Sequence, residues 1–308
     1  MQEKDKRIEP IKEYDTPAYQ PRKRRFGDRK VGRRLRTLPG MTQFMPFIMK
    51  TRNDGQNQFE DVIDITNVEK YLDAKHAEGF SDMTVLHVIL AAYVRVVSER
   101  PGINRFVAGQ RIYARNNVVC TMTVKKEMSL ESPDTCIKVE FDPRDDIYNV
   151  YKKFRVQVQK AVSDDTDFDK TVGAFAKLPR FMLRAAVSLL FWLDYHDKLP
   201  KALENVSPFH GSMIITSMGS LGIPAIYHHL YNFGTLPIFI SYGNIFTADA
   251  IKRDGTRERH HFITLKVVTD ERVCDGYYYA SAFKRLKKYM LHPELLDKSP
   301  ETVTEDID

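Results

Sequence analysis

The chain has 308 residues, of which 43% are hydrophobic and 29% are charged, the balance of a soluble globular protein that buries a sizeable core. The formal net charge is +6, yet the first 40 residues hold 13 Lys or Arg against 6 Asp or Glu, so the rest of the chain is close to neutral. A neutral body argues against a nucleic-acid-binding protein, and three widely spaced cysteines argue against a zinc site or a disulfide framework.

Neither end of the chain nor its interior predicts a membrane or secreted protein. The N-terminus is polar and lacks the apolar stretch of a secretory signal. The longest apolar run, residues 181–193, is interrupted by Arg184 and falls short of the roughly 20 residues that span a bilayer. We therefore expect a cytoplasmic protein without a transmembrane segment.

Residues 1–35 are predicted to be a basic N-terminal arm. They contain prolines and no apolar period, so we expect them to order only against another subunit. The run of residues 22–25 (RKRR) leaves a contact with nucleic acid or an anionic membrane as a less favoured alternative, since no aromatic interleaving or helix-turn-helix pattern accompanies it. At the other end, residues 296–308 are predicted to be an acidic, frayed tail.

Residues 36–295 alternate between strand and helix patterns and are predicted to form one mixed α/β domain. The expected strands are residues 47–49, 59–66, 117–125, 135–141, 211–217, 236–245 and 259–269, with a hairpin at 105–113. The expected helices are residues 67–76, 84–98, 145–162, 179–195 and 277–291. Ser81 and Asp82 are the cap candidates for the second helix, and residues 223–233 are predicted to be a short helix or an irregular connection.

The helix predicted at residues 179–195 is apolar on almost every side and carries the only tryptophan, Trp192. We expect it to be buried in the core or to contact a subunit. A surface-seeking helix and a wall for an apolar substrate are the alternatives.

Three segments resemble the chloramphenicol acetyltransferases and the acyltransferase cores of 2-oxo acid dehydrogenase complexes. They are residues 62–66 (VIDIT), residues 215–222 (ITSMGSLG) and residues 271–276 (ERVCDG). The last is similar to the His-x-x-x-Asp-Gly motif of that superfamily, with Glu271 in the position of the histidine. The resemblance implies a mixed sheet flanked by helices, a homotrimer, and a site between two subunits that takes coenzyme A or acyl-CoA as substrate. It covers the catalytic core only, so we expect no lipoyl-lysine in this chain, and no metal.

The resemblance also implies roles for particular side chains. Thr216 or Ser217 would donate a hydrogen bond to the oxyanion of the tetrahedral intermediate, and the choice between them stays open. Asp275 would pair with Lys50 or Arg52 and hold the loop before Gly276. The simpler alternative is that Asp275 caps the last helix and Gly276 permits the turn. Cys274 is expected to be a buried packing residue.

Glu271 separates the fold from the reaction. A carboxylate titrates about four pH units below a thiol, so an ordinary glutamate is a poor base for a thiol acceptor unless burial or a nearby carboxylate raises its pKa. His260 and His261 lie about 33 Å upstream on one strand, so they cannot act in the same subunit. His228 and His229 follow a turn whose path the sequence does not predict, and a contribution across a subunit interface is an open alternative.

Two functions follow. One is transfer of an acyl group from a CoA thioester to a small thiol or hydroxyl acceptor, with Glu271 as an atypical base. The other is a catalytically inactive pseudoenzyme, a trimer that binds a ligand or scaffolds partners. The sequence identifies neither the acyl group nor the acceptor.

Overall fold

A seven-stranded mixed sheet forms the centre of the protein in the computed structural model, which describes residues 10–16, 18, 23–125, 134–163, 167–251 and 253–308. The strand order is β2-β10-β8-β7-β5-β6, with β9 paired to β10 beyond the end of β2. β7 runs parallel to β5 and to β8, and the other neighbours are antiparallel. The strands are β2 (Gln56–Asp64), β5 (Val118–Lys125), β6 (Asp134–Phe141), β7 (Met213–Ser217), β8 (Ile238–Tyr242), β9 (Phe246–Ile251) and β10 (Arg257–Asp270).

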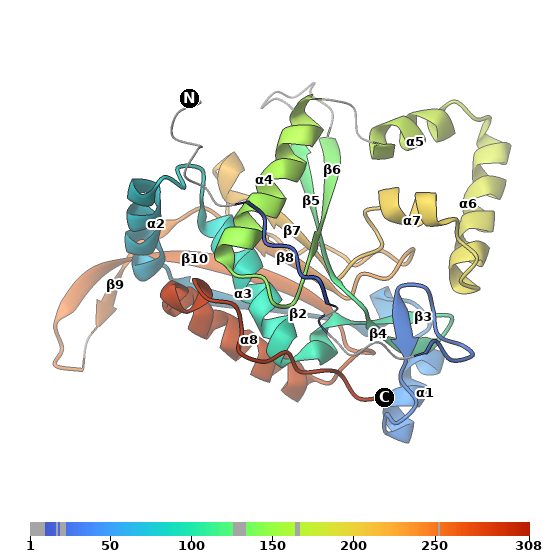
Figure 1. The fold of residues 1–308 in the computed structure, drawn as a ribbon, viewed down its shortest axis with the longest axis horizontal. Coiled ribbons are helices and arrows are strands. Elements are labelled where there is room, and N and C mark those ends of the chain that lie inside the picture. The colour runs from blue at the N-terminus through green and yellow to red at the C-terminus, as the bar shows by residue number, and fades with distance from the viewer. Residues whose placement is uncertain (1–9, 17, 19–22, 126–133, 164–166, 252) are drawn as a thin grey trace.

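Four helices cover one face of this sheet and enclose the main core (Figure 1). They are α2 (Thr66–Glu78), α3 (Val85–Glu99), α4 (Ile147–Ser163) and α8 (Gly276–Leu291). α3 lies deepest, with 13 of its 15 residues buried. Its N-cap is Thr84, which forms a capping box with His87, and not the expected Ser81 or Asp82.

The opposite face of the sheet, called the outer face below, is covered by an irregular segment. Residues 223–232, between β7 and β8, form neither helix nor strand and run across this face. Beneath them lies a small cluster of apolar side chains: Ile214, Leu230, Leu236, Phe239 and Val268. The irregular form of this connection, one of the two predicted alternatives, is confirmed.

A second sheet has three strands in the order β1 (Gly32–Arg34), β4 (Arg111–Arg115) and β3 (Arg105–Ala108). The helix α1 (Gly40–Ile48) follows β1, and the strand expected at residues 47–49 is wrong. The apolar side chains of this region recur at helical spacing, and a run of three apolar residues cannot by itself distinguish the two periods.

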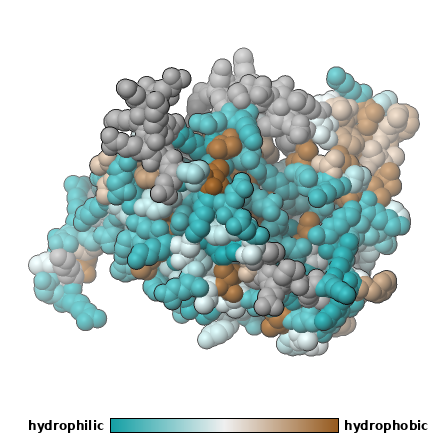
Figure 2. Space-filling model, in the orientation of Figure 1, coloured by the Kyte–Doolittle hydropathy of each residue, from teal (hydrophilic) through white to brown (hydrophobic). Residues whose placement is uncertain are grey.

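Three helices connect β6 to β7: α5 (Asp167–Ala176), α6 (Arg180–Tyr195) and α7 (Lys201–Val206). α6 stands at one end of the molecule, where Figure 2 shows hydrophobic side chains gathered (Figures 1 and 2). No residue of α6 is buried, and Phe181 is 75% exposed. The expectation that this helix enters the core of its own chain is therefore wrong, and a subunit contact stays a prediction.

Both terminal segments contact the body of the protein. The backbone N–H of Lys12 donates to the side chain of Asn149 on α4 at 2.8 Å, so the described part of the arm orders against its own chain. In the tail, both carboxylate oxygens of Asp306 accept hydrogen bonds from Arg105 at 2.6 Å. The expected frayed tail is wrong, because a buried arginine from the small sheet holds it.

Candidate functional site

The motif residues 271–276 connect β10 to α8. Glu271 is exposed, and its backbone N–H donates to the carbonyl of Gly55 at 2.7 Å. Val273 and Cys274 are buried, and burial raises the pKa of the Cys274 thiol. The expected packing role of Cys274 is confirmed, while the Glu271 carboxylate lies on the surface of the chain.

Asp275 caps the last helix and does not pair with a cation. Its carboxylate accepts a hydrogen bond from the backbone N–H of Tyr278 at 2.8 Å, and α8 begins at Gly276. Among the described residues Asp275 has no ion pair, and Lys50 contributes only its carbonyl to the nearby network. The simpler of the two sequence interpretations holds within one chain.

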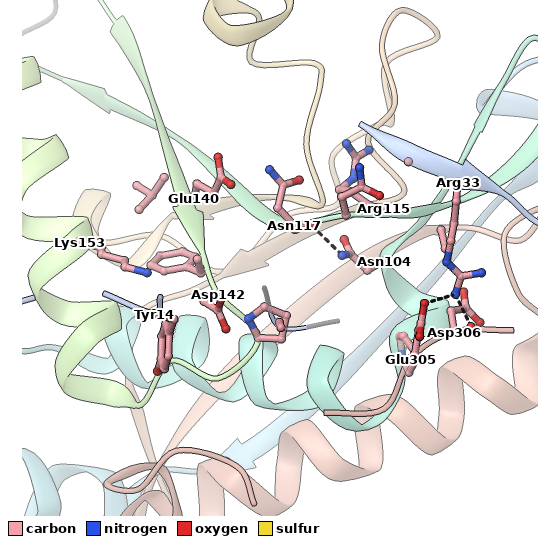
Figure 3. Close-up of a pocket in the computed structure, with 18 of the residues that line it drawn as sticks. Tyr14, Arg33, Asn104, Arg115, Asn117, Glu140, Asp142, Lys153, Glu305 and Asp306 are labelled. Atoms are coloured by element: carbon pink, nitrogen blue, oxygen red, sulfur yellow. Dashed lines mark hydrogen bonds and ion pairs between the residues drawn. The ribbon is translucent and has the colours of Figure 1, made fainter. Parts of the chain in front are cut away.

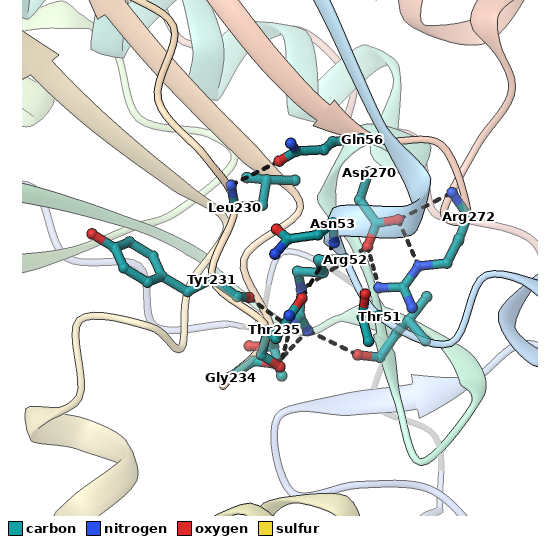
Figure 4. A network of polar contacts seen from close by, with 12 residues as sticks. Thr51, Arg52, Asn53, Gln56, Leu230, Tyr231, Gly234, Thr235, Asp270 and Arg272 are labelled. Carbon is teal, nitrogen blue, oxygen red and sulfur yellow. Dashed lines mark hydrogen bonds and ion pairs between the residues drawn. The ribbon is translucent and has the colours of Figure 1, made fainter.

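Arg52 lies instead in a buried network around Asp270, the residue before the motif (Figure 4). Arg272 donates two hydrogen bonds to the Asp270 carboxylate, at 2.8 and 2.7 Å, and Nε of Arg52 lies 3.9 Å from it. Arg52 also donates to the carbonyls of Tyr231 and Asn232 at 3.1 Å. Burial lowers the pKa of Arg52 to about 10, and Asp270 opposes that shift. The Asp270 carboxylate thus links Arg272 in the motif to Arg52, which holds the carbonyls at the end of residues 223–232.

Thr216 and Ser217 lie at the end of β7, on opposite faces of the sheet. Ile214 belongs to the outer-face cluster and Ile215 to the main core, so strand alternation directs Thr216 to the outer face and Ser217 to the core side. The Ser217 hydroxyl is hydrogen-bonded to Tyr242. Thr216 is therefore the hydroxyl that a substrate on the outer face would meet.

The strand register places Thr216 far from Glu271 in the same chain. Thr216 pairs with Ser241, which pairs with Lys266, and Glu271 follows Lys266 by five residues. At about 3.3 Å per residue the separation along the sheet is about 17 Å, with two strand spacings of about 4.8 Å in addition. A single chain does not bring these two predicted residues together.

His260 and His261 lie toward the other end of β10. Their ring nitrogens lie 2.5 Å from carboxylate oxygens of Asp64 and Glu69 respectively. The hydrogen bond to Asp64 raises the pKa of His260. Both histidines have carboxylate partners and lie about ten residues before Glu271 in the chain. This agrees with the prediction that neither histidine serves the motif in the same subunit.

His228 is a residue of the outer face that the sequence did not place. Its ring stacks on Phe239 with centroids 4.3 Å apart and planes 5° apart. Its Nε2 is buried and has no hydrogen-bond partner among the described residues. The stacking on Phe239, which pairs with Ile214 and Val268, places this histidine above the sheet, next to the row that contains Thr216.

A separate cavity of about 890 Å³ lies between the N-terminal arm, β6 and the tail (Figure 3). Acidic and basic side chains share its lining, among them Arg33, Glu140 and Lys153, together with the neutral Tyr14. Much of this charge is already paired, since Lys153 contacts Asp145 at 2.6 Å. Within the described ranges no group of three or more His, Cys, Asp or Glu could hold a metal ion, and no helix there is long and apolar enough to cross a bilayer.

Solved structures share this architecture over nearly their whole length. A probable dihydrolipoamide acetyltransferase from Listeria monocytogenes aligns with a TM-score of 0.54 and 14% identity, covering 91% of this chain and 99% of that one. This chain has the fold of a dihydrolipoamide acyltransferase catalytic core. The cubic core of a pyruvate dehydrogenase multienzyme complex gives a TM-score of 0.51 at 16% identity, covering 94% and 99% of the two chains.

A truncated catalytic core of the 2-oxoacid dehydrogenase multienzyme complex from Thermoplasma acidophilum also aligns, with a TM-score of 0.51 at 13% identity, covering 84% of this chain and 98% of that one. No family model matches the sequence, and no curated protein does. The mixed α/β fold predicted from the three motifs is confirmed.

Proposed function

We propose that this protein transfers an acyl group from a CoA thioester to a small thiol or hydroxyl acceptor. The observation that carries the proposal is the half-buried Thr216 at the end of β7, in a fold shared with dihydrolipoamide acetyltransferase cores. A hydroxyl fixed on a rigid strand donates to the oxyanion of the tetrahedral intermediate without having to reorganise. Three free cysteines agree with the reducing cytoplasm as the compartment.

The proposal places the motif loop of one copy beside the outer face of another. Thr216 and Glu271 are too far apart to act on one substrate in a single chain, so a site that uses both must be composite. Two of the structural neighbours are cores of multienzyme complexes. The large apolar side chains that α6 exposes agree with a contact between copies. A homotrimer is the assembly that we propose.

The motif position itself supports acyl transfer only in part. For the dihydrolipoamide acetyltransferase of Azotobacter vinelandii, a serine, a histidine and an asparagine four residues after the histidine are named in the catalytic mechanism. Glu271 and Asp275 have that same spacing here. Here a glutamate stands at the position of the histidine. That Glu271 acts as the base is therefore a prediction.

Release of free CoA tests the proposal. Purified protein with acetyl-CoA and dihydrolipoamide should release CoA thiol in proportion to enzyme, and light scattering should give the mass of a trimer. Thr216→Ala should lower kcat by about 10²–10³-fold, the usual effect of losing one oxyanion donor. Ser217→Ala is the matched control, because that hydroxyl lies on the core side and should change kcat little. Turnover unchanged in Thr216→Ala would contradict the assignment.

The second candidate is a pseudoenzyme, and the exposed carboxylate of Glu271 favours it. In that case the trimer forms and binds acyl-CoA, but no acceptor supports CoA release. Glu271→His should then create activity, because it restores a base that titrates near neutral pH.

A further inference from the structure

His228 is held in a fixed position on the outer face. Its ring lies flat on Phe239, and the residues around it are tied to the sheet. The backbone N–H of Ile226 donates to the hydroxyl of Ser241 at 3.3 Å, and that of Leu230 donates to the side chain of Gln56 at 3.0 Å. Arg52 then holds the carbonyls that follow. The imidazole therefore has little freedom to move with respect to β8.

A row of polar side chains crosses the sheet next to this imidazole. Thr216 on β7 pairs with Ser241 on β8, which pairs with Lys266 on β10, so all three face the same side. Phe239, beneath His228, is two residues before Ser241. Two residues along a strand and one strand spacing across place the Cα atoms of Thr216 and Phe239 about 8 Å apart. The Thr216 hydroxyl and the His228 imidazole therefore lie on the same face of the sheet, over adjacent strands.

The chemistry of His228 suits proton transfer. Burial lowers the pKa of His228 and the neighbouring His229 lowers it further, so the ring is neutral at pH 7. Charged groups beside the neighbouring residue Tyr227 include Lys266, whose ammonium lies 4.8 Å from the centre of the Tyr227 ring, and Glu60, which is 3.6 Å from that ammonium. A buried ring nitrogen without a partner is costly, and a bound thiol or hydroxyl would supply the missing partner.

We propose that His228 is the general base of acyl transfer on the outer face, in the role that the motif resemblance assigns to Glu271. The inference rests on the proposed function. His228 accepts the proton of the acceptor thiol or hydroxyl while the acceptor atom attacks the thioester carbonyl carbon. Thr216 donates to the resulting oxyanion. When the intermediate collapses, the bond from carbon to the CoA sulfur breaks, and the imidazolium returns its proton to the CoA thiolate.

Substitution of each of the two possible bases tests the proposal. His228→Asn should lower kcat with acetyl-CoA and dihydrolipoamide by about 10²–10⁴-fold, the range for loss of a general base. Acetyl-CoA affinity should stay within about threefold. His229→Asn, one position along the same segment and exposed, is the matched control and should retain activity. Glu271→Gln removes the competing base. In His228→Ala, added imidazole should restore turnover in proportion to its neutral form, which a purely structural role would not allow.

The pH dependence provides a readout that needs no variant. The kcat/KM of the unmodified protein should rise with pH and level off above an apparent pKa below the ordinary value of 6.5. If the His228 variants do not fold, diethyl pyrocarbonate decides, since activity should fall in step with labelling of His228 located by mass spectrometry.

The outcomes separate the two proposals. Loss of activity in Glu271→Gln with His228→Asn still active overturns the role of His228 and leaves acyl transfer standing. Absence of CoA release by the unmodified protein with every acceptor overturns both.

Discussion

The buried pair of arginines around Asp270 allows a quantitative prediction about stability. Asp270 is fully buried, and Arg52 and Arg272 are 4% and 3% exposed. Replacement of Asp270 by Asn preserves the volume of the side chain but removes the carboxylate that lies next to both guanidinium groups. Breaking a buried ion pair by removing one partner costs about 3–5 kcal/mol, because the remaining charge stays desolvated.

The expected change in melting temperature follows from the size of the chain. Unfolding entropy is about 2.1 cal/mol/K per residue, which for 308 residues is about 0.65 kcal/mol/K. A loss of about 3–5 kcal/mol therefore lowers Tm by about 5–8 °C. Differential scanning calorimetry of Asp270→Asn measures this shift. Glu271→Gln is the matched control, since it removes the next carboxylate along the chain from an exposed site and should change the free energy of unfolding by less than about 0.5 kcal/mol.

A Tm of Asp270→Asn within about 1 °C of the unmodified protein would refute this reasoning. It would mean that solvent reaches the arginines, or that the carbonyls of residues 231–234 satisfy them without the carboxylate. A larger loss in Glu271→Gln than in Asp270→Asn would mean that the motif carboxylate, and not the residue before it, supports the loop.

Three further predictions concern other parts of the fold. Burial lowers the pKa of His87 to about 4, so the unfolded chain binds more protons between pH 4 and 6.5; the free energy of unfolding should fall by up to about 3 kcal/mol as pH drops through that window, and His87→Gln should flatten the dependence in urea titrations. Asp306→Asn should destabilise the protein by about 3–5 kcal/mol, because it leaves the buried Arg105 unpaired, whereas the exposed neighbour Glu305→Gln should not; equal stability of the two variants would argue against a docked tail. Arg29→Ala should speed tryptic cleavage at Arg180 and Arg184, because Arg29 holds the last carbonyls of α6 at 2.7 and 2.5 Å; unchanged cleavage would show that α6 is anchored by other contacts.

The sequence by itself determined most of the secondary structure and the fold class. Apolar residues at helical spacing predicted α2, α3 and α8, and alternating or continuous apolar runs predicted β2, β7 and β10. These patterns depend only on which side chains of a segment face the core, so they can be recognised without knowing what packs against them. The pattern at residues 47–49 misled because a short apolar run fits either period, and β9 escaped notice because all but one of its residues are exposed.

Only the tertiary structure decided which charged and polar groups meet. Arg52 could pair with Asp275 or Asp270, and the two carboxylates are five residues apart; the turn after β10 buries Asp270 and turns Asp275 toward the N-terminus of α8. The path of residues 223–232 depends on hydrogen bonds to Ser241 on the following strand and to Gln56, which is 174 residues from its partner Leu230, so no local pattern could place His228 on the outer face. Periodicity reports burial, whereas partners are chosen by the packing of distant segments, and the candidate site consists of such partners.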